Sequence, residues 1–330
     1  MLRQLFSAVK STITSPTAAA ATRTMSTAPP PSPLKKPCKL ALLQLASGND
    51  KAANLANARK QVAAAAARGA NIVVLPECFN SPYGTSYFRT YAEPVPHGNT
   101  TYPESLTPSY TALSTAAREN NIYLIGGSIP EHDPATDALY NTSLTFSPTG
   151  ALLAAHRKIH LFDIDIPGKI RFIESEVLSA GNTPTLIDTP YGRVGVGICY
   201  DVRFPELAMM AARQGAFAML YPGAFNMTTG PLHWELLARA RAVDNQVWVG
   251  MCSPARSEEA GYTAWGHSMV VDPNGEVVAG MEEGEGYVEW ELVPERVVEV
   301  RRGIPVTRQR RFDVYADVAV AAPTEGKEVV

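Results

Sequence analysis

The stretch RVGVGICYDVRFPELAMMAARQGAFAMLY, residues 193–221, contains a complete strand–helix–strand unit. An apolar strand with two glycines is predicted over 193–199, an amphipathic helix over 205–213 and a second apolar strand over 217–221. Cys199 stands where the first strand ends and the turn into the helix begins. Because α/β sheets form their sites at the carboxyl ends of strands, this unit indicates both a fold class and a place for chemistry.

The same alternation recurs along the rest of the chain. Apolar strands are predicted over residues 39–45, 71–77, 122–128 and 247–251, and helices over 52–68, 110–120 and 232–244. Two antiparallel hairpins are predicted as well, 139–147 with 152–156 and 268–272 with 276–279. Strands that alternate with helices, together with hairpins, indicate a layered α/β fold built on sheets.

The composition argues against several classes of protein. A hydrophobic fraction of 45% with 18% charged residues is ordinary for a chain that buries a sizeable core. The net charge of −3 gives no electrostatic reason to expect nucleic acid or anionic lipid as a partner. No apolar run reaches the roughly 18 residues of a membrane helix. The four cysteines form no CxxC pair and the six histidines form no dense ligand motif, so we expect no disulfide framework, no metal and no other cofactor.

The two ends of the chain differ from its middle. Residues 1–49 contain no acidic residue, are rich in Ser, Thr and Ala and begin with MLRQLFSAVKSTI, which can form a helix with one apolar side. This composition is typical of a mitochondrial transit peptide, with a disordered tail as the alternative. Met25 offers a second start, which would give a cytosolic form. We expect a transit-like segment and a Pro-rich linker over 1–37, one domain over 38–316 and a tail over 317–330.

Cys199 is the candidate nucleophile. A cysteine on a sharp strand-to-helix turn projects into a cleft, where nearby backbone N–H groups can stabilise an oxyanion, and the N–H of Tyr200 is the natural donor. The alternative is a small buried core residue, which is the usual fate of a free cysteine. A thiol of ordinary pKa is mostly protonated at neutral pH, so it needs a base or a positive neighbour.

Three charged residues are candidates for that activation. Glu77 stands at the carboxyl end of the buried run over 71–77, where a carboxylate is costly unless it has a function, and burial would raise its pKa toward that of a useful base. Lys158 follows another apolar strand and could hold a thiolate–carboxylate pair together. Glu174 is a weaker candidate. The alternatives are a helix-capping acid for Glu77 and solvated surface charges for Lys158 and Glu174.

Four segments together resemble the nitrilase superfamily of carbon–nitrogen hydrolases. They are LPECFNSPYG (75–84), HRKIHLFDID (156–165), GICYDVRFPEL (197–207) and YPGAFNMTTGPLHWELLARARAVDNQVWV (221–249). The likeness covers nearly all of residues 38–316. The resemblance implies an α-β-β-α sandwich that forms a homodimer, a Glu77–Lys158–Cys199 triad, and Glu174 as a second glutamate that orients Lys158 or the substrate.

Within the superfamily the chain is most similar to the ω-amidase branch, on NSPYG (80–84), HLFDIDIPGKI (160–170) and the late SPAR and WGHS segments. This implies small-molecule ω-amide substrates such as α-ketoglutaramate, α-ketosuccinamate and succinamate. The cysteine would form a thioester with the acyl group, and Lys158 with the Tyr200 N–H would hold the oxyanion. Arg203 is the candidate for binding the carboxylate at the far end of the substrate, through two parallel hydrogen bonds. Tyr83, Phe225 and Thr228 match pocket positions.

Three alternatives remain open on the sequence. An amidase for deaminated glutathione would use the same triad, although FNMTTG and HLFDID favour the ω-amidase. A catalytically idle scaffold would have no reason to keep the three residues of the triad. A Cys-His-Asp hydrolase would use His160 and Asp163 instead of Glu77. For Arg203, the alternative to substrate binding is an internal salt bridge with Asp201 or Glu206.

Overall fold

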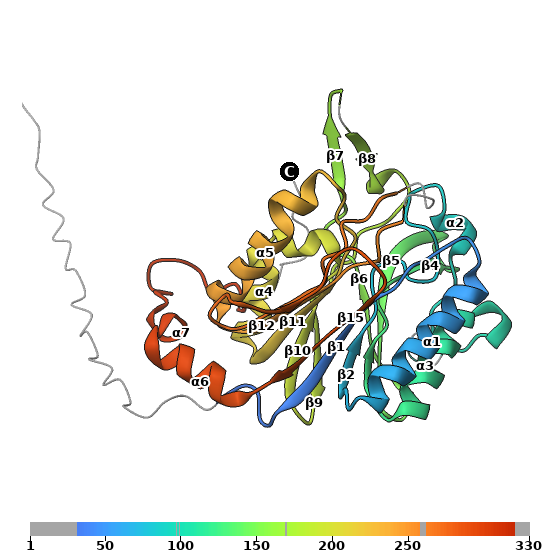
Figure 1. The fold of residues 1–330 in the computed structure, drawn as a ribbon. Coiled ribbons are helices and arrows are strands. Elements are labelled where there is room, and N and C mark those ends of the chain that lie inside the picture. The colour runs from blue at the N-terminus through green and yellow to red at the C-terminus, as the bar shows by residue number, and fades with distance from the viewer. Residues whose placement is uncertain (1–31, 97, 99, 169, 258–261, 321–330) are drawn as a thin grey trace, which may run out of the picture.

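The computed structural model describes residues 32–96, 98, 100–168, 170–257 and 262–320. Its core is two β-sheets that pack face to face, with helices covering both outer faces (Figure 1). This is the α-β-β-α sandwich expected from the sequence. The expected transit-like segment lies outside the described residues.

The first sheet has seven strands, in the order β15-β1-β2-β3-β5-β4 with β6 paired to β5. The strands are β1 (Cys38–Gln44), β2 (Ile72–Val74), β3 (Tyr123–Ile125), β4 (Ile129–Asp133), β5 (Ala138–Phe146), β6 (Leu152–Arg157) and β15 (Gly286–Leu292). β1, β2 and β3 run parallel to one another.

The second sheet has six strands, in the order β14-β13-β12-β11-β10-β9. They are β9 (Thr185–Thr189), β10 (Gly192–Val196), β11 (Ala216–Pro222), β12 (Trp248–Cys252), β13 (Met269–Val271) and β14 (Val277–Gly280). β10, β11 and β12 are parallel, so their carboxyl ends lie at one edge.

The helices cover the apolar outer faces of the two sheets. The longer ones are α1 (Lys51–Ala67), α3 (Pro108–Asn120), α4 (Pro205–Arg213), α5 (Thr229–Asn245) and α6 (Pro294–Gly303). Short turns complete them: α2 (Phe88–Tyr91), α7 (Val306–Gln309) and three 3-10 turns, η1 (Glu104–Leu106), η2 (Glu174–Glu176) and η3 (Cys199–Arg203). α1 begins where Asp50 accepts a hydrogen bond from the Ala53 N–H, and it stops at Gly69, whose φ is +92°.

Alternation along β1 explains the layers. Leu40 and Leu42 face the second sheet and join the core between the sheets, while Ala41 and Leu43 face the other way and pack under α1 and α3. A third core lies between the second sheet and the pair α4 and α5, around Trp234. Three stacked cores require four layers, which is why both sheets are apolar on both faces.

The predicted elements are found with several corrections. The strand predicted over 122–128 ends at Ile125, because Gly127 turns the chain with φ +61°, and β4 starts only at Ile129. The strand predicted over 193–199 ends at Val196. The helix predicted over 232–244 begins three residues earlier, at Thr229. Leu34, inside the expected linker, is fully buried in the core between the sheets.

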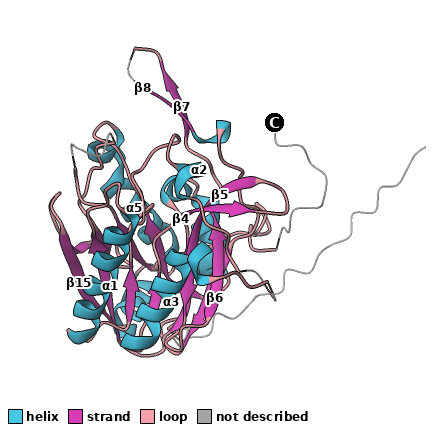
Figure 2. Cartoon of the chain, turned by 90° about the vertical axis from the view of Figure 1, so that its right-hand side faces the viewer, coloured by secondary structure: helices cyan, strands magenta, loops and turns pink. Residues whose placement is uncertain are grey.

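Several elements were not predicted, among them β9, β15, α6 and one hairpin. β7 (Asp163–Ile166) and β8 (Ile170–Ile173) form a two-stranded hairpin outside both sheets. Figures 1 and 2 show it projecting from the end of the sandwich near α2 and α5. Lys158 comes shortly before this hairpin in the chain and Glu174 directly after it, so its base borders the predicted site.

Candidate active site

Three predicted residues are brought together from three different strand ends. Glu77 lies just past β2, Lys158 directly follows β6, and Cys199 lies just past β10. The side chains of Glu77 and Lys158 are fully buried, and Cys199 is 4% exposed. The two sheets therefore contribute different members of one buried polar cluster.

Both carboxylate oxygens of Glu77 are occupied. Oε1 accepts hydrogen bonds from Asn141 Nδ2 at 2.8 Å and from Lys158 Nζ at 3.2 Å, and Oε2 accepts one from the Ala224 N–H at 2.8 Å. The Cys199 thiol interacts with the same carboxylate, and this interaction lowers the pKa of Glu77 against the increase that burial causes. Such a contact between a nucleophile and a base is the geometry that proton transfer requires.

Lys158 bridges two buried carboxylates. Its Nζ lies 2.9 Å from Glu174 and 3.2 Å from Glu77. Glu174 also accepts hydrogen bonds from the Tyr83 hydroxyl at 3.0 Å and from the Phe162 N–H at 2.7 Å. A buried charge is tolerated only when it is paired and hydrogen-bonded, and each of these charges is.

The turn that carries Cys199 is held by Asp201. Cys199 has a φ of +47°, a conformation that non-glycine residues rarely adopt. Asp201 Oδ2 accepts a hydrogen bond from the Ile198 N–H at 2.9 Å, and its Oδ1 accepts one from the His160 N–H at 2.9 Å. One buried carboxylate thus ties the Cys199 turn to the segment that follows Lys158. Because η3 begins at Cys199, its first N–H groups have no acceptor within that turn, which is the condition for the Tyr200 N–H to serve as a donor.

Burial sets the acid–base properties of the cluster. It raises the pKa of the Glu77 carboxyl; the charge of Lys158 counteracts this and the charge of Glu174 adds to it. Burial also raises the pKa of the Cys199 thiol well above its ordinary value, with a further increase from Glu77. Burial alone would lower the pKa of Lys158, but Glu174 and Glu77 raise it well above the usual value. The arrangement is therefore a protonated thiol beside a carboxylate of increased basicity, with a fixed ammonium next to it.

Two small adjoining hollows open onto this cluster. One is lined by Glu77, Tyr83 and Tyr262, among others, and the other by Cys199, Arg203 and again Tyr262. Ala224 lines both. The base and the nucleophile thus line two hollows that have Ala224 and Tyr262 in common.

The structure places three of the four predicted substrate-binding residues at these hollows. Tyr83 lines the first, and Arg203 and Phe225 line the second. Thr228 is exposed and lines neither, whereas the next residue, Thr229, is buried and lines the second. The prediction at Thr228 therefore falls one residue from the side chain that faces the site, because α5 begins at Thr229 and turns Thr228 outward.

Two alternatives fail on geometry. His160 Nδ1 lies 2.8 Å from Asp201 Oδ1 and its ring stacks on Phe204 at 3.6 Å, while Asp163 is exposed and accepts from the Ser175 N–H. His160 and Asp163 therefore form no pair. Arg203 makes no ion pair with Asp201 or Glu206, since Asp201 is occupied by His156 and His160.

Several site residues went unpredicted. Asn141 lies in the middle of β5 and is fully buried. An amide side chain in the middle of a predicted hairpin strand is a signal that could have identified it. Tyr262 and Phe162 lie in loops, and Tyr262 donates to the Ala224 carbonyl at 2.5 Å. The Ala224 N–H has no sequence signal at all, because every residue except proline has the same donor.

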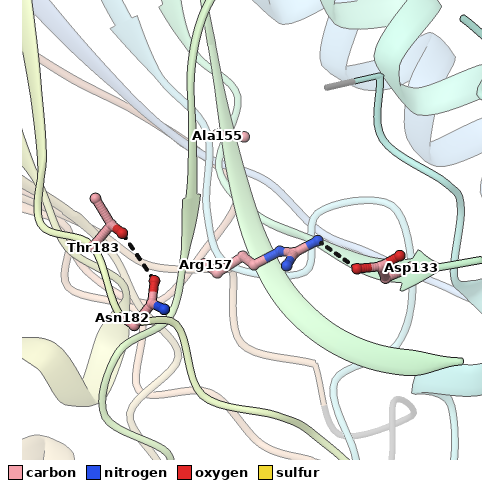
Figure 3. Close-up of a pocket in the computed structure, with 5 residues that line it drawn as sticks. All are labelled: Asp133, Ala155, Arg157, Asn182 and Thr183. Atoms are coloured by element: carbon pink, nitrogen blue, oxygen red, sulfur yellow. Dashed lines mark hydrogen bonds and ion pairs between the residues drawn. The ribbon is translucent and has the colours of Figure 1, made fainter. Parts of the chain in front are cut away.

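Other candidate sites in the described chain carry less chemistry. A hollow of about 360 Å³ is lined by Asp133, Ala155, Arg157, Asn182 and Thr183 (Figure 3). Its cation, Arg157, is already paired with Asp133 and Glu131. His267, Glu282 and Glu283 have metal-ligand side chains near one another, but both carboxylates are exposed. In the part of the chain that the structure describes, no helix is both long and apolar enough to span a membrane.

Comparison with known proteins identifies the family. Residues 39–302 match the family model described as "Carbon-nitrogen hydrolase". The chain belongs to the carbon–nitrogen hydrolase family. This carbon–nitrogen hydrolase is 54% identical over 288 residues to "Omega-amidase NIT3" of Saccharomyces cerevisiae, covering 86% of this chain and 97% of that protein. It is 55% identical over 279 residues to "Omega-amidase NIT2" of Mus musculus, covering 84% and 96% of the two chains.

A solved structure agrees with the sequence comparisons. The crystal structure of Saccharomyces cerevisiae Nit3, described as a member of branch 10 of the nitrilase superfamily, matches with a TM-score of 0.77 and 52% identity. The match covers 85% of this chain and 98% of that one. The carbon–nitrogen hydrolase described here is thus a member of the nitrilase superfamily with an α-β-β-α sandwich fold.

Proposed function

We propose that this protein is an ω-amidase that hydrolyses the terminal amide of small dicarboxylate monoamides, such as succinamate, α-ketoglutaramate and α-ketosuccinamate, to the acid and ammonia. The observation that carries the proposal is the buried cluster of Cys199, Glu77 and Lys158, in which Lys158 donates a hydrogen bond to Glu77 and the Cys199 thiol interacts with the same carboxylate. The similarity to yeast and mouse ω-amidases supports the choice of substrate.

The first half of the reaction forms an acyl-enzyme. Glu77 takes the thiol proton of Cys199 while the sulfur attacks the amide carbon, and the carbonyl oxygen becomes an oxyanion. Lys158 and the Tyr200 N–H stabilise that negative charge. When the C–N bond breaks, the leaving nitrogen takes the proton from Glu77 and departs as ammonia, which leaves a thioester on Cys199.

The second half returns the enzyme to its starting state. Glu77 takes a proton from water, and the resulting hydroxide attacks the thioester carbon. The C–S bond breaks, the acid is released, and the proton on Glu77 returns to the sulfur. The raised pKa of Glu77 suits both directions of transfer, because a base and acid of intermediate strength works best near the operating pH.

Arg203 is the proposed partner of the distant carboxylate. It lines the same hollow as Cys199, and within the described residues it forms no ion pair. A guanidinium left without an anion beside the nucleophile suits a substrate that brings its own carboxylate.

The test is ammonia release by the full-length chain, offered succinamate, α-ketoglutaramate and deaminated glutathione separately. We expect a preference for the short ω-amides that Cys199→Ala abolishes. Cys38→Ala is the matched control, because Cys38 is a buried thiol in the core between the sheets. Preference for deaminated glutathione would move the protein to the alternative amidase branch, and release of ammonia from none would favour the idle scaffold.

We also propose that the protein forms a homodimer through α5. Leu232, Leu236 and Val243 are 64%, 62% and 50% exposed and follow a helical spacing, so they form one apolar stripe. A second copy would cover this stripe. Leu236→Glu should shift the sedimentation coefficient from dimer to monomer, whereas a wild-type monomer would contradict the proposal.

For localisation, we propose import into mitochondria, on the composition of residues 1–24 alone. Fluorescent fusions of the full chain and of a chain starting at Met25 should differ, the first in mitochondria and the second in the cytosol. Identical distributions would contradict it.

A further inference from the structure

The guanidinium of Arg203 is held beside the nucleophile by aromatic rings rather than by an anion. Its Cζ lies 4.9 Å from the ring centre of Phe225 and 5.5 Å from that of Tyr200. Its Nε is buried and has no hydrogen-bond partner. A buried donor without a partner is costly, so this group points to a ligand that the site is built to receive.

Helix α5 fixes the main chain at Arg203. Arg241, which is itself almost fully buried, donates from Nε to the Val202 carbonyl and from Nη2 to the Arg203 carbonyl, both at 2.8 Å. The start of the same helix carries Thr229, which lines the hollow with Cys199. The position of Arg203 relative to the nucleophile is therefore set by one rigid element.

The same helix also holds the side chain. Arg203 Nη1 lies 3.2 Å from Nδ1 of His233, one turn into α5. Because a guanidinium has donors only, His233 Nδ1 must accept this hydrogen bond, which leaves the ring proton on Nε2. With Nη1 occupied, the edge formed by Nε and Nη2 is what remains for a carboxylate, and that edge can bind both oxygens at once.

We infer that His233 is a specificity-determining residue, which positions Arg203 so that its Nε–Nη2 edge receives the far carboxylate of an ω-amide. The inference rests on the proposed function, because it concerns the substrate's second charged group. His233 acts through Arg203 and is a positioning residue. Its removal therefore weakens the binding of anionic amides and leaves the chemistry at Cys199 intact.

The experiment compares two substrates of similar shape and different charge, succinamate and its methyl ester, with the full-length enzyme. His233→Leu and His233→Ala remove the acceptor, whereas His233→Asn places an amide oxygen close to where Nδ1 stands. We expect the first two to raise KM for succinamate about tenfold, which is about 1.4 kcal/mol, with kcat within about twofold. KM for the ester should not change, and His233→Asn should restore KM for succinamate to within about threefold of wild type.

The matched control is Glu235→Gln, an exposed residue of the same helix whose carboxylate pairs with Arg239. It should leave both substrates unaffected. Equal losses on succinamate and the ester, or no loss at all in His233→Leu and His233→Ala, would overturn the inference. If the proposed function is wrong, the wild-type enzyme will not prefer succinamate to its ester. That result is distinct from a failure of the inference, which appears only in the His233 variants.

Discussion

Tyr262 is linked to Glu77 through the backbone of one residue, Ala224. Its hydroxyl donates to the Ala224 carbonyl at 2.5 Å, and the N–H of the same residue donates to Glu77 Oε2 at 2.8 Å. Burial raises the pKa of the Cys199 thiol, and the backbone of Ala224 acts in the opposite direction. Tyr262, a loop residue, thus influences Glu77 indirectly, through the hydrogen bonds of Ala224.

Tyr262→Phe should lower kcat about five- to tenfold, the equivalent of one hydrogen bond of about 1 kcal/mol. A less firmly held Ala224 N–H stabilises the Glu77 carboxylate less, so the pKa of Glu77 should rise and the acid limb of the pH–rate profile should move to higher pH. Tyr287→Phe, at an exposed tyrosine on β15, is the control. An unchanged acid limb in Tyr262→Phe would contradict this role.

Glu77→Gln should reduce the rate of acylation by at least about a hundredfold, because general base catalysis typically contributes that much. Burst release of ammonia from succinamate measures this step directly. His160→Ala should keep acylation within about tenfold of wild type, since His160 bonds to Asp201 and not to the thiol. The opposite ranking would restore the Cys-His-Asp mechanism.

Asp201→Asn should change how stability depends on pH. Burial alone would raise the pKa of Asp201, but hydrogen bonds from His156 and His160 reverse this and bring it well below the ordinary value. The ionised carboxylate therefore stabilises the fold above about pH 4, and that contribution is lost as the pH falls toward the folded-state pKa.

The variant lacks this contribution, so it should be less stable at neutral pH and lose stability less steeply between about pH 4 and about pH 2. Urea unfolding at several pH values measures both. If the free energy of unfolding falls equally steeply with pH in the variant and the wild type, Asp201 is not responsible for this pH dependence. Asp165→Asn, at an exposed aspartate of β7, serves as the control.

Gly127→Ala should destabilise the protein by more than about 2 kcal/mol. Gly127 has a φ of +61°, and a Cβ there would lie 2.1 Å from the Pro76 carbonyl oxygen, next to Glu77. Gly215→Ala separates the two effects, because Gly215 has a φ of +89° and open space around it. It should cost only about 1 kcal/mol. If thermal unfolding shows that the two variants lose equal stability, the structure around Gly127 shifts and relieves the contact with Pro76.

The periodic parts of the fold were predictable because burial dictates them. Leu40 and Leu42 alternate with Ala41 and Leu43, and such a pattern identifies a strand buried on both faces. The turn at Cys199 was also predictable, from a glycine-containing strand that runs into a helix with Pro205 at its start.

The remaining features depend on contacts between distant residues. The sequence alone does not show that Lys158 bonds to both Glu77 and Glu174, since those contacts span 81 and 16 residues. The hairpin β7–β8 was missed because its strands are only four residues long and lie outside the two main sheets. Short strands of this kind give too little periodicity to be recognised.

The β7–β8 hairpin has a consequence for how this enzyme can be altered. Its two roots, Phe162 and Glu174, are tied to each other by hydrogen bonds of 2.7 Å and 3.2 Å, and Glu174 grips Lys158 from the same point. The Lys158 ammonium is therefore held at the base of the hairpin. Phe172, near the base of β8, stacks on Tyr83 and belongs to the support of the site. We expect the part of the hairpin beyond Phe172 to be replaceable, so that hairpins of other lengths redesign access to the enzyme while its reactive centre keeps its geometry.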